Sequence, residues 1–144
     1  MKLQELTFGL LRLAIAAMWL FAGIPKLLNN SAFAITILNY RIGGIWLASL
    51  GAVLVPFWEV ILAALLISGK YRKFAWWFSL GLILFFDGLV VQAYLRGLQI
   101  DCGCFGEAAE QLIGPAKLLE NGILTFLIFI GTLLANKKEA RLTQ

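Results

Sequence analysis

Residues 45–68 read IWLASLGAVLVPFWEVILAALLIS, and Glu59 is the only charged residue among them. A run of about 20 apolar residues is long enough to cross the hydrocarbon core of a bilayer as a helix. Pro56 lies inside the run, where we expect it to kink the helix or to mark a change of direction. A carboxylate at this depth is costly, so we expect Glu59 to be paired or functional. The stretch therefore predicts a membrane-spanning helix.

The composition extends this interpretation to the whole chain. Of its 144 residues, 61% are hydrophobic and 14% are charged, whereas soluble domains average about 45–50% apolar and about 25% charged residues. A chain of this length cannot bury so much apolar surface in a core of its own, so lipid must cover the rest. The net charge of +4 is scattered between apolar runs, which favours membrane-orienting charges over a nucleic-acid surface.

Four apolar runs predict an all-α integral membrane protein, a four-transmembrane-helix bundle that forms one membrane domain over residues 1–144. The spans are expected at about 6–24, 45–68, 74–95 and 115–135. Pro25 and Lys26 are expected to close the first span. Asn29, Asn30 and Ser31 are expected to form a turn with a helix cap, followed by a short helix at about 32–38 that lies at the membrane interface.

The distribution of basic residues predicts the orientation. With four spans, both termini and the loop at 69–73 share one side, which carries Lys2, Lys70, Arg72, Lys73, Lys137, Lys138 and Arg141. The other side carries fewer basic residues (Lys26, Arg41, Arg96 and Lys117) and the acids Asp101, Glu107, Glu110 and Glu120. The positive-inside rule then places both termini in the cytoplasm (N-in, C-in) and the 96–114 loop outside the cell's inner (cytoplasmic) membrane.

That loop holds both cysteines of the chain, Cys102 and Cys104, and the chain has no His. A disulfide across one residue closes a strained ring, and Gly103 supplies the backbone freedom that the ring needs. Strain raises the reduction potential, so we expect an exchange-prone, redox-active pair. Zinc normally takes four ligands, so no metal site is expected. A passive clip on the loop and soft-metal capture by two thiolates remain alternatives.

Charged residues near the pair in sequence, or inside the spans, are candidates to support it. Arg96 or the N-terminus of the following helix can lower a thiol pKa, whereas Asp101 opposes this effect. Glu59 and Asp87 are intramembrane acids. They can form a structural pair, carry protons released by thiol oxidation, or meet a basic residue at the outer end, namely Lys26, Arg41 or Arg96.

Aromatic residues are abundant, and most are expected to face lipid or to lie at the membrane interface. A few of them near the cysteines can form a flat slot for a quinone ring. The candidates are Trp19, Phe21, Trp58 and Phe105.

The run from Arg96 to Gly106, which ends in Cys102-Gly103-Cys104-Phe105-Gly106, resembles the MauE branch of the DoxX-like membrane proteins. The same pattern is found in FAGIPKL at 21–27, in NYR at 39–41, and from Pro56 to Glu59. The resemblance implies a four-helix membrane bundle associated with redox chemistry, with the two cysteines as the redox pair. Its polar pattern positions would be Lys26, Arg41, Glu59 and Arg96, whereas Asp87 matches none.

The resemblance also implies partners. MauE proteins are linked to making methylamine dehydrogenase, whose small subunit is rich in disulfides, alongside a thioredoxin-like protein. The wider group includes a quinone-linked thiosulfate oxidoreductase subunit. We therefore expect a membrane thiol–disulfide oxidoreductase that exchanges electrons between an extracytoplasmic thioredoxin-like or disulfide-containing protein and a membrane quinone.

Two alternatives differ in class. One is a Cu(I)-type binding or transport protein. The lack of Met or His clusters argues against it, since the chain has only Met1 and Met18. The other is a non-catalytic scaffold for the maturation of a disulfide-rich protein. Which cysteine attacks, and in which direction electrons flow, stay open.

Overall fold

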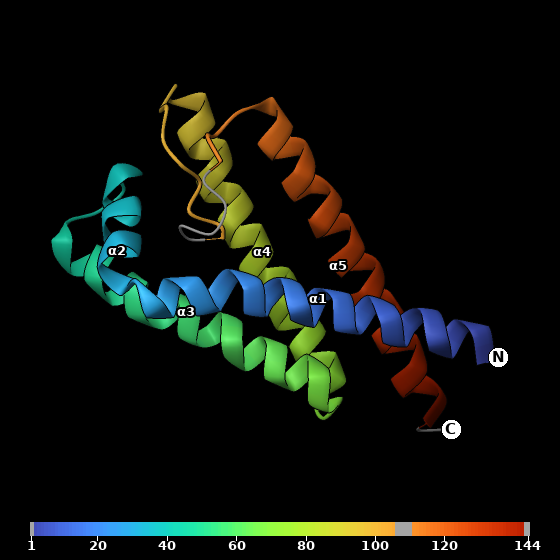
Figure 1. Ribbon diagram of the computed structural model, residues 1–144. Coiled ribbons are helices and arrows are strands. Elements are labelled where there is room, and N and C mark those ends of the chain that lie inside the picture. Colours follow the sequence, from blue (N-terminus) through green and yellow to red (C-terminus); the bar gives the residue numbers. More distant parts are fainter. Residues whose placement is uncertain (1, 106–110, 143–144) are drawn as a thin grey trace.

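The computed structural model describes residues 2–105 and 111–142, which form five helices and no strand (Figure 1). The helices are α1 (Lys2–Leu28), α2 (Asn30–Asn39), α3 (Ile45–Ser68), α4 (Arg72–Leu95) and α5 (Pro115–Leu142). Four of them are long and apolar enough to cross a membrane, over Glu5–Leu28, Ile45–Ser68, Arg72–Leu95 and Pro115–Lys137. The predicted all-α class with four candidate spans is confirmed.

The first span is longer than its sequence predicts, because α1 continues through Pro25 and Lys26 to Leu28. Proline has no N–H to donate inside a helix, but a membrane helix tolerates this loss where neighbouring groups satisfy the freed carbonyl. The chain then turns at Asn29, whose N–H donates to the Pro25 carbonyl at 3.0 Å. The Asn29 side chain accepts from the N–H of Ala32, so Asn29 is the N-cap, and α2 begins at Asn30 within the predicted turn instead of at about residue 32.

The helices form two closely packed pairs. α1 packs along α3, and α4 packs along α5, while α2 folds back against α3. The start of α1 and the end of α5 lie at one end of the molecule (Figure 1). α2 and the segment between α4 and α5 lie away from that end. The cysteine segment contacts the end of α2, where the C-cap residue Tyr40 donates a hydrogen bond to it.

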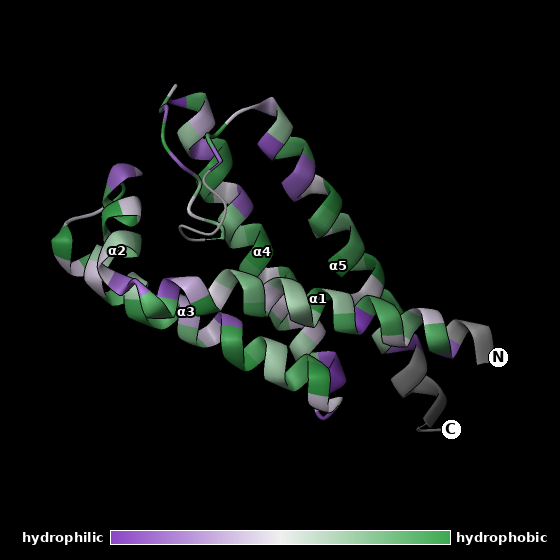
Figure 2. Cartoon of the chain, viewed as in Figure 1, coloured by the Kyte–Doolittle hydropathy of each residue, from purple (hydrophilic) through white to green (hydrophobic). Residues whose placement is uncertain are grey.

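Hydrophobic residues run along most of the length of the helices (Figure 2), and many of their large apolar side chains are exposed on the outside of the bundle. Trp46, Leu28 and Leu95 are exposed to 87%, 83% and 78%. A soluble monomer rarely shows so continuous an apolar surface, and a bilayer provides the environment that covers it. Inside, Trp19 and Trp76 are buried between the helix pairs, and the Trp76 ring lies where a side chain at Gly131 would project.

Candidate functional site

The two cysteines are free thiols that lie against each other in the segment between α4 and α5. The N–H of Cys104 donates to the Cys102 sulfur at 3.2 Å. Gly103 between them has φ +64°, a left-handed conformation that a residue with Cβ adopts at a cost, and a Cβ there would also collide with Thr36. Gly103 thus has a backbone conformation that favours glycine, whereas the disulfide ring for which this freedom was predicted is not formed between the two free thiols.

Asp101 organises the cysteine segment rather than acting on the sulfurs alone. One of its carboxylate oxygens accepts the N–H of Gly103 at 2.7 Å, and the other accepts the N–H of Gln111. The N–H of Cys102 donates to the Gln111 carbonyl at 3.0 Å. These bonds tie the two arms of the segment together next to the thiols. Gly106 lies outside the described residues.

Tyr40, at the end of α2, belongs to the NYR pattern at 39–41 but was not among the predicted site residues. Its hydroxyl donates to the carbonyl oxygen of Cys102 at 2.7 Å, and its side chain is 5% exposed. Burial, with the nearby Cys104, Cys102 and Asp101, raises the pKa of this phenol far above its usual value, so it stays a donor. Arg96 donates to the backbone carbonyl of Tyr40 at 3.2 Å. Arg41 is exposed, in a left-handed turn.

Lys117, in the first turn of α5, is a cation that acts to lower the pKa of both thiols, and Lys26 acts in the same direction on Cys104. Arg96, one of the two groups predicted for this role, is not among the groups that shift either pKa. The Nζ of Lys117 lies 4.9 Å from the ring centroid of Phe105 and donates to Gln111 at 2.6 Å. The side-chain hydrogen bond from Cys104 lowers the pKa of Cys102, and Lys117 adds to this effect against the opposing effect of burial. The same hydrogen bond, together with burial, raises the pKa of Cys104. The arrangement therefore favours ionisation of Cys102 over that of Cys104.

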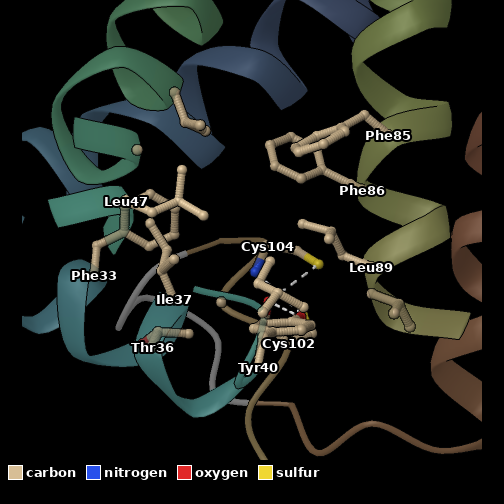
Figure 3. Close-up of a pocket in the computed structure, with 15 residues that line it drawn as sticks. Phe33, Thr36, Ile37, Tyr40, Leu47, Phe85, Phe86, Leu89, Cys102 and Cys104 are labelled. Atoms are coloured by element: carbon tan, nitrogen blue, oxygen red, sulfur yellow. Dashed lines mark hydrogen bonds between the residues drawn. The ribbon is translucent and has the colours of Figure 1, made fainter. Parts of the chain in front are cut away.

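A large apolar cavity of about 130 Å³ adjoins the pair (Figure 3). It lies between α2, α3 and α4, and Cys102 and Cys104 lie on the side that faces Phe86 and Leu89 of α4. Leu47 and Phe85 line it as well, and each is about half exposed on the outer surface of the bundle. The cavity therefore adjoins the surface that lipid would cover.

A second, smaller cavity of about 20 Å³ lies on the inner side of Cys104. It is lined by side chains of α1, α3, α4 and α5, and its polar lining residues include Glu59 and Asn121. Cys104 and Phe86 line both cavities. The sulfur-bearing residue Cys104 thus separates an apolar chamber from a chamber that contains a carboxylate.

Lys26 and Glu59 form an ion pair inside the bundle, and this pair positions the carboxylate. Their Nζ–Oε1 distance is 2.6 Å, and both side chains are 0% exposed. The Lys26 ammonium also lies 5.0 Å from the ring centroid of Phe33 and 5.2 Å from that of Phe86. The structure therefore pairs Glu59 with Lys26, one of the partners considered from the sequence. Asp87 is bonded elsewhere, to the hydroxyl of Thr125 on α5.

The aromatic residues expected to hold a quinone do not gather into one slot. Trp19 lines the small cavity and donates through its indole N–H to Ser79 at 3.1 Å. The ring of Phe21 packs on that of Phe105 at 5.7 Å. Trp58 lies against Phe78 and lines neither cavity. The aromatic lining of the large cavity comes from α2 and α4 instead.

No metal cluster is found in the part of the chain that the structure describes. No three of its His, Cys, Asp or Glu side chains are grouped to hold an ion.

The family model described as "Methylamine utilisation protein MauE" matches residues 4–134, a range that contains both cysteines, Tyr40, Lys117 and the Lys26–Glu59 pair. The chain belongs to this family. Among relatives of known name, the chain is 28% identical over 144 residues to a methylamine utilization protein MauE of Paracoccus denitrificans, covering 99% of this chain and 77% of that protein. No solved structure matches the chain. This MauE-family chain is thus a multi-pass membrane protein.

Proposed function

We propose that this MauE-family protein is a membrane thiol–disulfide oxidoreductase whose redox centre is the Cys102–Cys104 pair. The observation that carries the proposal is the division of labour between the two thiols. The Cys102 thiol has a lowered pKa and accepts the N–H of Cys104, whereas the pKa of the Cys104 thiol is raised. A thiolate is the attacking species in thiol–disulfide exchange, and a neighbouring thiol resolves the mixed disulfide.

The exchange is balanced as follows. The Cys102 thiolate attacks a partner's disulfide, forms a mixed disulfide and releases one partner thiolate. Cys104 loses its proton and attacks the Cys102 sulfur, which releases the second partner thiolate. Two electrons have then moved from the protein to the partner, and the protein holds a Cys102–Cys104 disulfide. The reverse sequence oxidises a dithiol partner.

For the reverse direction, we propose a membrane quinone as the substrate that reoxidises the pair. The quinone takes two electrons and two protons and becomes the quinol. The cavity beside the cysteines supports this assignment, because an apolar cavity of roughly 150 Å³ binds one benzene ring in another protein, and this one has about 130 Å³. Its lining of Phe33, Phe85 and Phe86 suits a planar ring.

We propose that the partner on the other side is an extracytoplasmic thioredoxin-like protein, or a disulfide-containing protein that takes part in methylamine utilisation. The name of the family supports this assignment. The basic residues gathered at the α3–α4 turn, Lys70, Arg72 and Lys73, support an orientation with that end in the cytoplasm. The cysteine segment then lies on the extracytoplasmic side of the inner membrane, where disulfides persist.

The test measures quinol formation by the purified, reduced protein in lipid nanodiscs with a short-chain ubiquinone. Val55→Phe places a ring in the large cavity and is expected to abolish quinol formation while leaving exchange with a small disulfide intact. Val53→Phe is the matched control, since Val53 is 55% exposed on the outer face of the same helix. Equal quinol formation by both variants would contradict the cavity assignment.

The cysteines themselves are tested by Cys102→Ser and Cys104→Ser, each of which is expected to end both reactions. A protein that still supports its partner's maturation with both cysteines replaced by alanine is a scaffold. Stoichiometric binding of Cu(I) by the reduced protein, with no exchange activity, would instead identify a metal-binding protein.

A further inference from the structure

One oxygen of the buried carboxylate of Glu59 takes no part in the ion pair. Oε1 accepts from Lys26, whereas Oε2 is buried and has no hydrogen-bond partner among the described residues. Asn121 of α5 has an unpartnered donor: its Nδ2 is buried and has no hydrogen-bond partner among the described residues. Its side chain is 4% exposed. A buried polar group without a hydrogen-bond partner destabilises the protein, so both groups call for a partner.

Both residues line the small cavity, and Cys104 lines it with them. A cavity of about 10–15 Å³ on this measure holds one water molecule, provided that two to four polar groups bind it. The volume here is about 20 Å³, and the polar groups are a carboxylate oxygen, an amide N–H and a thiol. Room and partners therefore match one water and exclude a larger ligand.

We propose that Glu59 is the proton acceptor for Cys104, acting through a single water molecule bound in this cavity. The inference rests on the proposed thiol–disulfide function and adds to it the path of the proton. In the resolving step the S–H bond of Cys104 breaks, and its proton passes to the water as a water proton passes to Oε2. The Cys104 sulfur then bonds to Cys102, and the leaving thiolate departs with its electron pair.

The ion pair explains how a carboxylate is kept available as an acceptor at this depth. Lys26 neutralises Glu59 before the transfer, and afterwards the ammonium remains over the rings of Phe33 and Phe86. Among the described residues, the titratable groups that face this cavity are Glu59 and Cys104, with Lys26 facing Glu59 from α1. Asp87 on α4 is bonded to Thr125, outside the cavity lining.

The test follows the reaction of the reduced, purified protein with 4,4′-dithiodipyridine, a neutral aromatic disulfide. Thiopyridone is released twice, first when Cys102 attacks and again when Cys104 resolves the mixed disulfide. Glu59→Gln keeps the volume of the side chain and an oxygen for Lys26, and it is expected to slow only the second release. The reduction is expected to be about 100-fold, at the lower end of general-base effects.

A second variant leaves the ion pair untouched. Asn121→Leu removes one of the groups that hold the water, and its second release is expected to be slower by about tenfold or more. Glu59→Asp is expected to restore part of the rate. Asp87→Asn is the control, since it changes an intramembrane carboxylate outside this cavity. In the slow variants the second release should also rise more steeply with pH, because hydroxide then removes the proton.

The outcomes separate the two proposals. If the wild-type protein shows no first release, the thiol pair is not reactive and the proposed function fails. If both releases occur and the second is as fast in Asn121→Leu and in Glu59→Gln as in the wild type, the proton path is refuted and the proposed function stands. If Glu59→Gln does not fold, Asn121→Leu decides the inference by itself.

Discussion

Removing the ammonium of Lys26 is expected to destabilise the protein severely. Lys26→Met keeps the length of the side chain but leaves Glu59 charged and unpaired at 0% exposure. Breaking one partner of a buried pair costs about 3–5 kcal/mol. The cation–π contacts with Phe33 and Phe86 are lost as well, although a methionine sulfur regains about 0.3–1.5 kcal/mol against aromatic rings. We therefore expect a net loss of about 3–5 kcal/mol in the free energy of unfolding.

The assay is reversible unfolding in mixed micelles, followed by tryptophan fluorescence while the fraction of denaturing detergent is raised. The double variant Lys26→Met/Glu59→Leu has no buried charge and is expected to regain at least about 2 kcal/mol over Lys26→Met, because apolar replacement of a whole pair is often neutral or stabilising. Lys70→Met, at the exposed α3–α4 turn, is the control and should change stability by about 0.5 kcal/mol or less. If Lys26→Met is as stable as Lys70→Met, the reasoning is refuted.

Three further predictions concern the cysteine segment. Gly103→Ala forces a β-carbon into a left-handed turn and against Thr36. The free energy of unfolding should therefore fall by about 1–3 kcal/mol, which thermal unfolding in detergent measures. An unchanged midpoint of unfolding would show that the β-carbon does not collide with Thr36. Tyr40→Phe removes the donor to the Cys102 carbonyl and should speed alkylation of Cys102 by iodoacetamide, which mass spectrometry can follow; equal rates would mean that the hydroxyl does not hold the segment. Cys104→Ala removes the hydrogen bond that lowers the pKa of Cys102, so the pH at which Cys102 alkylation reaches half its maximal rate should rise, and a fall would reverse the assigned direction.

The helices could be predicted from sequence where a change of hydropathy coincides with a structural stop. The predicted span at 45–68 has the same bounds as α3, because Gly44 precedes it and Gly69 ends it in a left-handed cap with φ +67°. Other ends were missed because hydropathy reports the limits of the membrane and not those of the helix. α5 was expected to end at about residue 135 and continues to Leu142, through polar residues that helical geometry admits equally well.

In the site, too, contacts between sequence neighbours could be predicted, whereas contacts between distant residues could not. The turn at Gly103 and its cysteines are neighbours in sequence, so their arrangement was predictable. Tyr40 lies 62 residues from the cysteine that it binds, and no pattern in a single sequence specifies that contact. The sequence placed Lys26 at the end of the first apolar run, but its pairing with Glu59, 33 residues away, depends on how α1 packs on α3.

The burial of Cys102 also makes its reaction rate depend on the shape of the reactant. Cys102 is only 5% exposed, and the Tyr40 hydroxyl holds its backbone carbonyl in place, so a small charged thiol from water reaches little of this residue. Two donors of equal reduction potential will therefore react at different rates, according to whether they can fit beside the buried residue. Such a centre can stay far from equilibrium with the surrounding pool of small thiols. It exchanges electrons only with reactants whose shape lets them reach the cysteines.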